Sequence, residues 1–264
     1  MEKDKIHVKL KTIAQTLFRQ ETMDIGLISG KMSAVIFYFH YARFTGDNSY
    51  NEAAMVLLDE IQSQLLFNST DKSYRSGLAG IGIAFDYLVE NGFVEVEEDF
   101  LDDIDKALYA AFMSDPSTGF SLYDGLIGHA WYWLCRTNKP YSEMLLSEIL
   151  SIIQRNSLLL SSTELFDYHN LLFELNCLPV FGQRKSNFLK AFRRKYFLNP
   201  DESYPRLTNS PADELARAHL MKKYWQFDWY TPMIDEEKLG NSAWDGLYLL
   251  SVLSPKKKSW IGLL

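Results

Sequence analysis

The chain has 264 residues, 47% hydrophobic and 14% aromatic, and is long enough to bury a sizeable core within one domain. Its formal net charge of -7 argues against nucleic-acid binding, because phosphate contacts need clustered lysine and arginine side chains. No apolar run approaches the ~20 residues of a membrane-spanning helix, and the charged N-terminal segment lacks the apolar core of a secretory signal. Two cysteines make no disulfide framework, so we expect a cytoplasmic protein.

Amphipathic helices are predicted along the chain wherever apolar residues recur at steps of three and four residues. In the first of them the pattern places Leu10, Ile13, Leu17 and Phe18 on one helical face. No alternating stretch is long enough to predict a sheet. The predicted helices span Lys9 to Arg19, Tyr50 to Phe67, Phe100 to Phe112, Met144 to Ile153 and Phe188 to Phe197.

A glycine-led phrase recurs between these helices, with lead glycines at Gly30, Gly77 and Gly125, in steps of 47 and 48 residues. An apolar, aromatic run follows each copy, and a helix that is apolar on every side is buried. Each repeat therefore predicts a buried inner helix followed by an amphipathic outer helix. Self-similarity at such a period is typical of one supersecondary unit used repeatedly.

The remaining repeats are less regular. Residues 155–240 are rich in proline and are predicted to hold two degenerate units, and a final copy near Asn241 has lost its lead glycine. The prediction is one all-α domain, residues 1–264, in which helical hairpins close into a ring of two concentric layers.

Four segments carry a resemblance to a known family. The stretches Gly26 to Lys31, Ser76 to Gly82, Leu122 to Gly128 and Trp244 to Leu250 resemble repeats of lanthionine synthetase C-like proteins. The resemblance implies an α/α toroid with a central cavity at the glycine-led ends of its inner helices. Members of the family typically close thioether rings in ribosomally made peptides.

The resemblance also implies a zinc ion held by two cysteines and one histidine, which keeps a substrate thiol deprotonated. The family's Trp-Cys and Cys-His-Gly segments are not found in this chain. Cys177 has no adjacent histidine, and Cys135 lies in the third inner helix. We therefore predict no metal site and no cofactor, and interpret both cysteines as small buried apolar side chains.

Two candidate catalytic residues stand at the start of the third inner helix. Asp124 occupies the place of a family histidine before a glycine, either as a cavity carboxylate or as an ordinary N-cap, as Ser29 and Ser76 are predicted to be. His129 follows on the first helical turn and could move protons near neutral pH, with a structural histidine as the alternative.

Candidate binding residues lie at the cavity-end turns. Asp245 is one of them, with a turn or cap carboxylate as the alternative. The aromatic cluster from Tyr224 to Tyr230 predicts a lid, a peptide-gripping wall or buried anchors. His169 is interpreted as a surface or loop residue. The full candidate set is Trp244, Asp245, Gly77, Gly80, Gly125 and Gly128.

Three functions follow. The leading one is a zinc-free family member that binds a precursor peptide, or a partner peptide-modifying enzyme, in or beside the cavity. The second is a zinc-dependent lanthionine cyclase. The third is a carbohydrate-active toroid, which needs two carboxylates about 5–10 Å apart, such as Asp124 with Asp245 or Asp86. Whether the protein is an enzyme is left open by the sequence.

Overall fold

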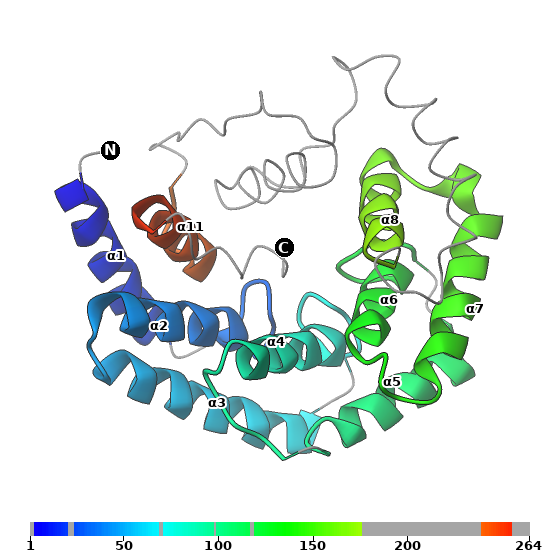
Figure 1. Ribbon diagram of the computed structural model, residues 1–264, viewed down its shortest axis with the longest axis horizontal. Coiled ribbons are helices and arrows are strands. Elements are labelled where there is room, and N and C mark those ends of the chain that lie inside the picture. Colours follow the sequence, from blue (N-terminus) through cyan, green and yellow to red (C-terminus); the bar gives the residue numbers. More distant parts are fainter. Residues whose placement is uncertain are drawn as a thin grey trace. The chain divides into compact units, whose positions relative to one another are not determined.

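The computed structural model describes residues 3–20, 24–68, 71–97, 99–116, 119–175 and 239–254. Within these ranges every regular element is a helix, which confirms the predicted all-α class (Figure 1). The predicted helix from Phe188 to Phe197, the aromatic cluster from Tyr224 to Tyr230 and Cys177 all lie outside the described residues.

The chain divides into two compact units, Met1–Asp105 with Thr208–Leu264, and Lys106–Leu207. The helices of the first unit are α1 (Lys3–Phe18), α2 (Lys31–Thr45), α3 (Ser49–Asn68), α4 (Leu78–Glu90) and α11 (Ala243–Leu253). The second unit holds α6 (Leu126–Cys135), α7 (Ser142–Arg155), the short 3-10 helix η1 (Ser157–Leu159) and α8 (Ser162–Leu175), and α5 (Asp102–Ser114) crosses the boundary.

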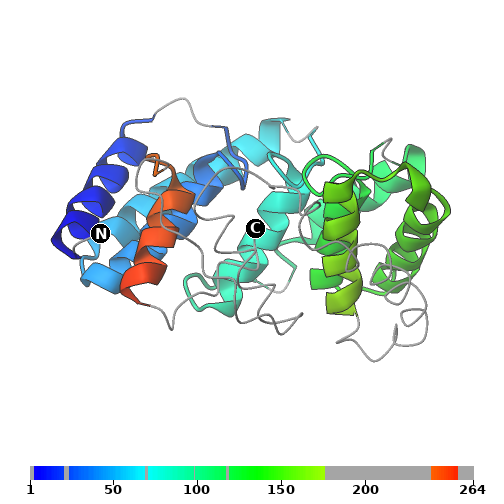
Figure 2. The same cartoon turned by 90° about the horizontal axis from the view of Figure 1, so that it is seen from above.

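Helices far apart in the sequence pack together in the first unit. Both views show α11 beside α1 and α2 (Figures 1 and 2). Gly246 makes this packing close, because a Cβ atom at this position would overlap the ring of Phe37 on α2. The beginning and the last described helix of the chain thus share one core.

Inner and outer helices pair as the repeat pattern predicts. The inner helix α2 is buried without a break from Lys31 to Phe39, and α4, α6 and α11 are buried almost as completely. The outer helix α3 packs along α2, and α7 packs along α6. All four predicted amphipathic helices in the described part of the chain are present, with ends shifted by a few residues or, for α1, extended to an earlier start.

One predicted core position of α1 is wrong, because Phe18 is 75% exposed. The buried stripe of the helix passes through Leu17, and the next residue lies about 100° further round the helix, facing away from the core. The stripe itself consists of Ile6, Leu10, Ile13, Ala14 and Leu17.

The same loop precedes each of the three glycine-led inner helices. We call residues 24–30, 71–77 and 119–125 the first, second and third glycine loops. In each, the N–H of the first helical residue donates a hydrogen bond to the carbonyl oxygen of the first loop residue, which closes the loop onto the helix start. The pairs are Lys31 N to Asp24 O (2.7 Å), Leu78 N to Asp71 O (3.1 Å) and Leu126 N to Gly119 O (3.0 Å).

This closure leaves no room for a side chain at the lead glycine. A Cβ atom on Gly125 would lie 2.6 Å from the carbonyl oxygen of Gly119, and one on Gly77 would lie 2.6 Å from that of Asp71. Glycine is the residue that permits such a close backbone approach. Glycine therefore recurs at steps of 47 and 48 residues because each loop leaves no room for a Cβ atom at the lead position.

The predicted N-caps are wrong. The N-cap residues of α2, α4 and α6 are the glycines themselves, and no side chain makes the capping hydrogen bond. Ser29, Ser76 and Asp124 each stand one residue before the N-cap position, and a loop carbonyl accepts from the first helical N–H.

Ser76 stabilises its own loop instead of the helix. Its hydroxyl donates to the Asp71 carboxylate at 2.7 Å, and the N–H of Ser73 donates to the same carboxylate at 2.8 Å. Burial alone would raise the pKa of the Asp71 carboxyl, but these hydrogen bonds outweigh it and hold that pKa below its usual value.

The two other buried helices, α8 and α11, begin with reciprocal capping boxes. Ser161 and Glu164 exchange bonds at the start of α8, with Ser161 N to Glu164 Oε2 at 2.8 Å and Glu164 N to Ser161 Oγ at 3.3 Å. Ser242 and Asp245 do the same at α11. These two helices thus begin at a Ser-x-x-acid signature. The interval predicted to hold degenerate units includes α8.

The close approach at the third glycine loop predicts that Gly125→Ala lowers the free energy of unfolding by about 1–3 kcal/mol, because the loop must move away from the helix. Urea denaturation followed by circular dichroism measures the change. The matched control is Gly119→Ala in the same loop, where a Cβ atom meets nothing within 4 Å, so a change below about 0.5 kcal/mol is expected. Equal effects of the two substitutions would contradict the steric account.

Candidate functional site

In the first unit the N-terminal ends of three inner helices are joined through the backbone of one residue, Ile28. The N–H of Ile28, in the first glycine loop, donates to the carbonyl of Arg75 in the second at 3.0 Å. The carbonyl of Ile28 accepts from the indole Nε1 of Trp244 at 2.7 Å. Trp244 is buried, so this candidate binding residue ties the start of α11 to the first glycine loop.

Asp245 is a cap carboxylate, as its alternative interpretation predicts. Its Oδ2 accepts from the backbone N–H of Ser242 at 3.1 Å and from the hydroxyl of the same residue at 2.5 Å. The side chain is buried at the helix start. Because this carboxylate is engaged in capping, it is a poor partner for acid–base chemistry on a sugar.

The candidate glycines occupy packed backbone positions. A Cβ atom on Gly80 would overlap the carbonyl oxygen of Tyr74 and lie 3.1 Å from Cβ of Leu27. Gly77 is enclosed by its own loop, and Gly125 and Gly128 are buried at the start of α6. A role for these four glycines in binding stays a prediction.

The structure places the two candidate catalytic residues in different environments of the second unit. Asp124 is exposed just before the helix start, and its N–H donates to Oγ of Ser121 at 3.0 Å. His129 is buried on the first turn of α6, and its backbone N–H donates to the carbonyl of Gly125 at 3.4 Å. Asp86 and Asp245 belong to the first unit, whereas Asp124 belongs to the second.

The described residues do not fit the zinc set that the resemblance implies. They include one cysteine, Cys135, and no group of three or more His, Cys, Asp or Glu side chains in the described ranges is arranged to hold a metal ion. The expectation that Cys135 is buried is wrong. It is exposed because it is the last residue of α6, where the chain leaves the buried helix.

Sequence reasoning missed a group of buried polar residues on α8, namely Asp167, His169 and Asn170. The interpretation of His169 as a surface or loop residue is wrong, because it lies in a run of the helix that is buried from Leu165 to Leu171. Burial, with a smaller contribution from Glu164, raises the pKa of the Asp167 carboxyl to about 7.

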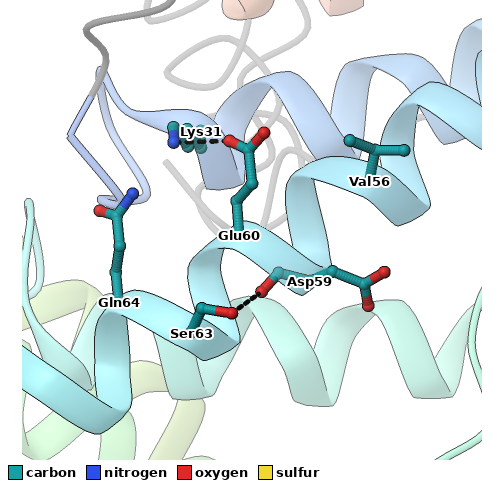
Figure 3. Close-up of a pocket in the computed structure, with 6 residues that line it drawn as sticks. All are labelled: Lys31, Val56, Asp59, Glu60, Ser63 and Gln64. Atoms are coloured by element: carbon teal, nitrogen blue, oxygen red, sulfur yellow. Dashed lines mark hydrogen bonds and ion pairs between the residues drawn. The ribbon is translucent and has the colours of Figure 1, made fainter.

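A shallow pocket of about 370 Å³ lies in the first unit where α2 begins against α3 (Figure 3). Lys31, at the first position of α2, has a side chain only 8% exposed, and its Nζ lies 2.6 Å from Oε2 of Glu60 on α3. The ion pair ties an inner helix to its outer helix. The pocket is lined by Lys31, Val56, Asp59, Glu60, Ser63 and Gln64.

The described part of the chain is thus a helical-hairpin repeat protein whose first inner helices start at glycine loops. The family model described as Lanthionine synthetase C-like protein matches residues 21–173. Because this match covers more than half of the chain, the protein belongs to that family, which has the α/α toroid fold and is linked in general to peptide modification.

No curated protein and no solved structure gave a significant match to the chain. Among the described helices, none combines the length and the apolar character that a membrane crossing requires.

The capping box of α11 predicts that Asp245→Ala lowers the free energy of unfolding by about 1 kcal/mol, because the N–H of Ser242 loses its acceptor. The thermal midpoint measures the loss. Asp59→Ala is the matched control, since the Asp59 side chain is exposed on α3 and should change stability by less than about 0.5 kcal/mol. An unchanged or raised midpoint for Asp245→Ala would contradict the capping role.

The raised pKa of Asp167 predicts how stability depends on pH. Its carboxyl stays protonated in the folded protein up to about pH 7, whereas the unfolded chain releases the proton near pH 4, so its contribution to stability falls as pH rises between these values. Relative to Asp167→Asn, the wild type should lose roughly 1.4 kcal/mol of unfolding free energy per pH unit in this window. Urea denaturation at several pH values measures the difference, and parallel curves would contradict it.

Proposed function

We propose that this protein acts in the maturation of ribosomally made, lanthipeptide-type peptides and binds or modifies a precursor peptide in or beside the toroid cavity, without zinc. The observation that carries the proposal is the family match over residues 21–173, which takes in all three glycine-led inner helices and most of α8. In this proposal residues 1–264 form one cytoplasmic domain, and a peptide-modifying enzyme is a further partner.

The cysteine and histidine side chains of the described residues support the zinc-free form of the proposal. A zinc site of the family's kind needs two thiolates and an imidazole within bonding distance of one point. In the described ranges the single cysteine, Cys135, is exposed at a helix end and belongs to no group of three or more metal-ligating side chains. The alternative is the zinc-dependent cyclase, which would require Cys177 and other residues outside those ranges.

His129 and Asp124 are the proposed proton-transfer residues. Their position at one end of a buried helix supports this role, since imidazole and carboxylate groups can exchange protons with a substrate thiol. Trp244 and the four glycines would hold the binding end of the inner helices in place. For the carbohydrate-active alternative, the engagement of Asp245 in its capping box counts against the pair of Asp124 with Asp245 and leaves the pair of Asp124 with Asp86.

Binding to a fluorescein-labelled synthetic peptide with one dehydroalanine and one cysteine tests the proposal. We expect saturable binding, with a dissociation constant of about 1–100 μM, that is the same with zinc and with a chelator, because the proposed contacts do not use metal. Fluorescence anisotropy measures the affinity, and alkylation of the free thiol followed by mass spectrometry measures ring closure. The control peptide carries alanine in place of both dehydroalanine and cysteine.

The outcomes separate the candidate functions. Elemental mass spectrometry of protein purified without chelator should find far less than one zinc per chain. About one tightly held zinc that is lost in Cys177→Ala, together with zinc-dependent loss of the peptide thiol, would replace the proposal by the cyclase. No binding of the modifiable peptide, or equal binding of the control peptide, would overturn a role specific to lanthipeptide-type precursors.

A further inference from the structure

The outer face of α1 is basic, although the chain as a whole has 27 Lys and Arg against 34 Asp and Glu. Asp4 is the one acidic residue between positions 3 and 19. Successive helical residues are rotated by about 100°, so four residues of α1 share an arc of about 140° opposite its buried stripe. With Arg19, which directly follows the helix, they form what we call the α1 basic face. The four helical members are Lys5, Val8, Lys11 and Phe18.

All five side chains of the α1 basic face are exposed. Val8 is 68% exposed and Phe18 is 75% exposed. Within the described ranges Lys5, Lys11 and Arg19 form no ion pair. A single exposed apolar residue is ordinary, but two large ones among cations make a surface that suits a partner with both apolar and acidic groups.

A surface with apolar and acidic groups lies in the second unit. A groove of about 420 Å³ between α5 and α7 is lined by four apolar side chains, two serines and Glu148. Two of the apolar side chains, Met113 and Met144, are 58% and 51% exposed. Methionine is flexible and polarizable, and it is frequent at protein interfaces. The exposed carboxylates of Asp115 and Glu143 follow or precede these methionines closely in the sequence. We call this site the α5–α7 groove.

Glu148 is accessible to a second cation. Its Oε1 lies 3.4 Å from Nη2 of Arg155, and the two side chains are 56% and 65% exposed. An exposed ion pair of this kind contributes only about 0–1 kcal/mol, so an incoming arginine can share the carboxylate. Met144 stands one helical turn before Glu148, about 5–6 Å away at Cβ. Neighbouring apolar and cationic side chains, such as Phe18 and Arg19, can therefore contact both at once.

We propose that this chain associates with a second copy of itself, with the α1 basic face of one copy packed on the α5–α7 groove of the other. Phe18 enters the groove beside Met113 and Met144, and Arg19 lies against Glu148. The remaining cations of the face add longer-range attraction to the carboxylates around the groove. The two surfaces differ, so the contact is heterologous unless two such contacts close a two-fold dimer.

A second copy is the occupant that accounts for both surfaces. An anionic lipid surface would attract the α1 basic face, but it would repel the carboxylates of the α5–α7 groove. A basic helix of another protein would fit the groove and leave Val8 and Phe18 uncovered. Charge and apolar character match when the two surfaces meet each other. The inference is independent of the proposed function, because neither surface includes the residues to which that function is assigned.

Sedimentation equilibrium of the full chain, from about 1 to 100 μM, tests the inference. We expect reversible self-association in about 0.05 M salt, weakened at least about tenfold in about 0.5 M salt, where charges are screened within a few ångströms. Phe18→Ser, Arg19→Glu and Glu148→Lys should each weaken it at least about tenfold. All three residues are exposed, so the thermal midpoint followed by circular dichroism should stay unchanged.

A mixture of the Arg19→Glu and Glu148→Lys proteins provides the sharpest test. In a mixed pair the acidic substitute at position 19 meets the basic substitute at position 148, so association should return although neither variant associates alone. Val89→Ser and Glu90→Lys on α4 are the matched controls for loss of an exposed apolar side chain and for charge reversal. Each should leave association within about twofold.

Three results would overturn the inference. The protein is monomeric up to about 100 μM in low salt, the three variants associate as tightly as the wild type, or the mixture of charge variants stays monomeric. A monomeric protein that binds vesicles containing phosphatidylserine, and loses this binding in Arg19→Glu, would make the α1 basic face a membrane surface instead.

Discussion

The hydrogen bond between the first helical N–H and the carbonyl at the start of its glycine loop is the constraint on which the repeats depend. It satisfies the first N–H of the helix with backbone alone and brings two backbone segments so close that a Cβ atom cannot fit between them. The carbonyl belongs to Asp24 in the first loop, Asp71 in the second and Gly119 in the third. Since main chain makes the contact, the side chains around it are free to serve the loop, as Ser76 does.

The protein solves the same problem in two ways. Where a glycine loop precedes an inner helix, the helix start is fixed by a folded segment that also contacts its neighbour, as Ile28 contacts Arg75. At α8 and α11 a serine and an acidic residue cap the helix within one turn. The second solution needs no preceding loop, which frees the chain before these helices from the spacing of the first three repeats.

Periodicity predicted the helices and their burial well because burial of apolar faces determines both. The spacing predicted the lead glycines, but it did not predict the loop-closing hydrogen bond that requires them. The acceptor residues of that bond, Asp24 and Asp71, repeat at the same 47-residue step, and the sequence analysis did not use this repeat. The exposure of Cys135 and the burial of His169 depend on where helices end and pack, which a sequence pattern does not give. Asp167 and Asn170 lie one turn apart on α8, a spacing at which polar residues usually indicate a solvent face, and only their burial reverses that interpretation.

The hydrogen bond between Trp244 and Ile28 joins residues 216 positions apart, so it can form only late in the synthesis of these residues. The second unit is synthesised as one continuous stretch. The first unit consists of two segments separated by the second unit, so its helix α11 is synthesised only after the second unit. Until then α2 lacks the helix that packs across Phe37. Contacts of such long sequence separation form slowly, because the intervening chain must first be brought together. The part of α2 that packs against α11 therefore lacks this contact until residues 243–253 have been synthesised.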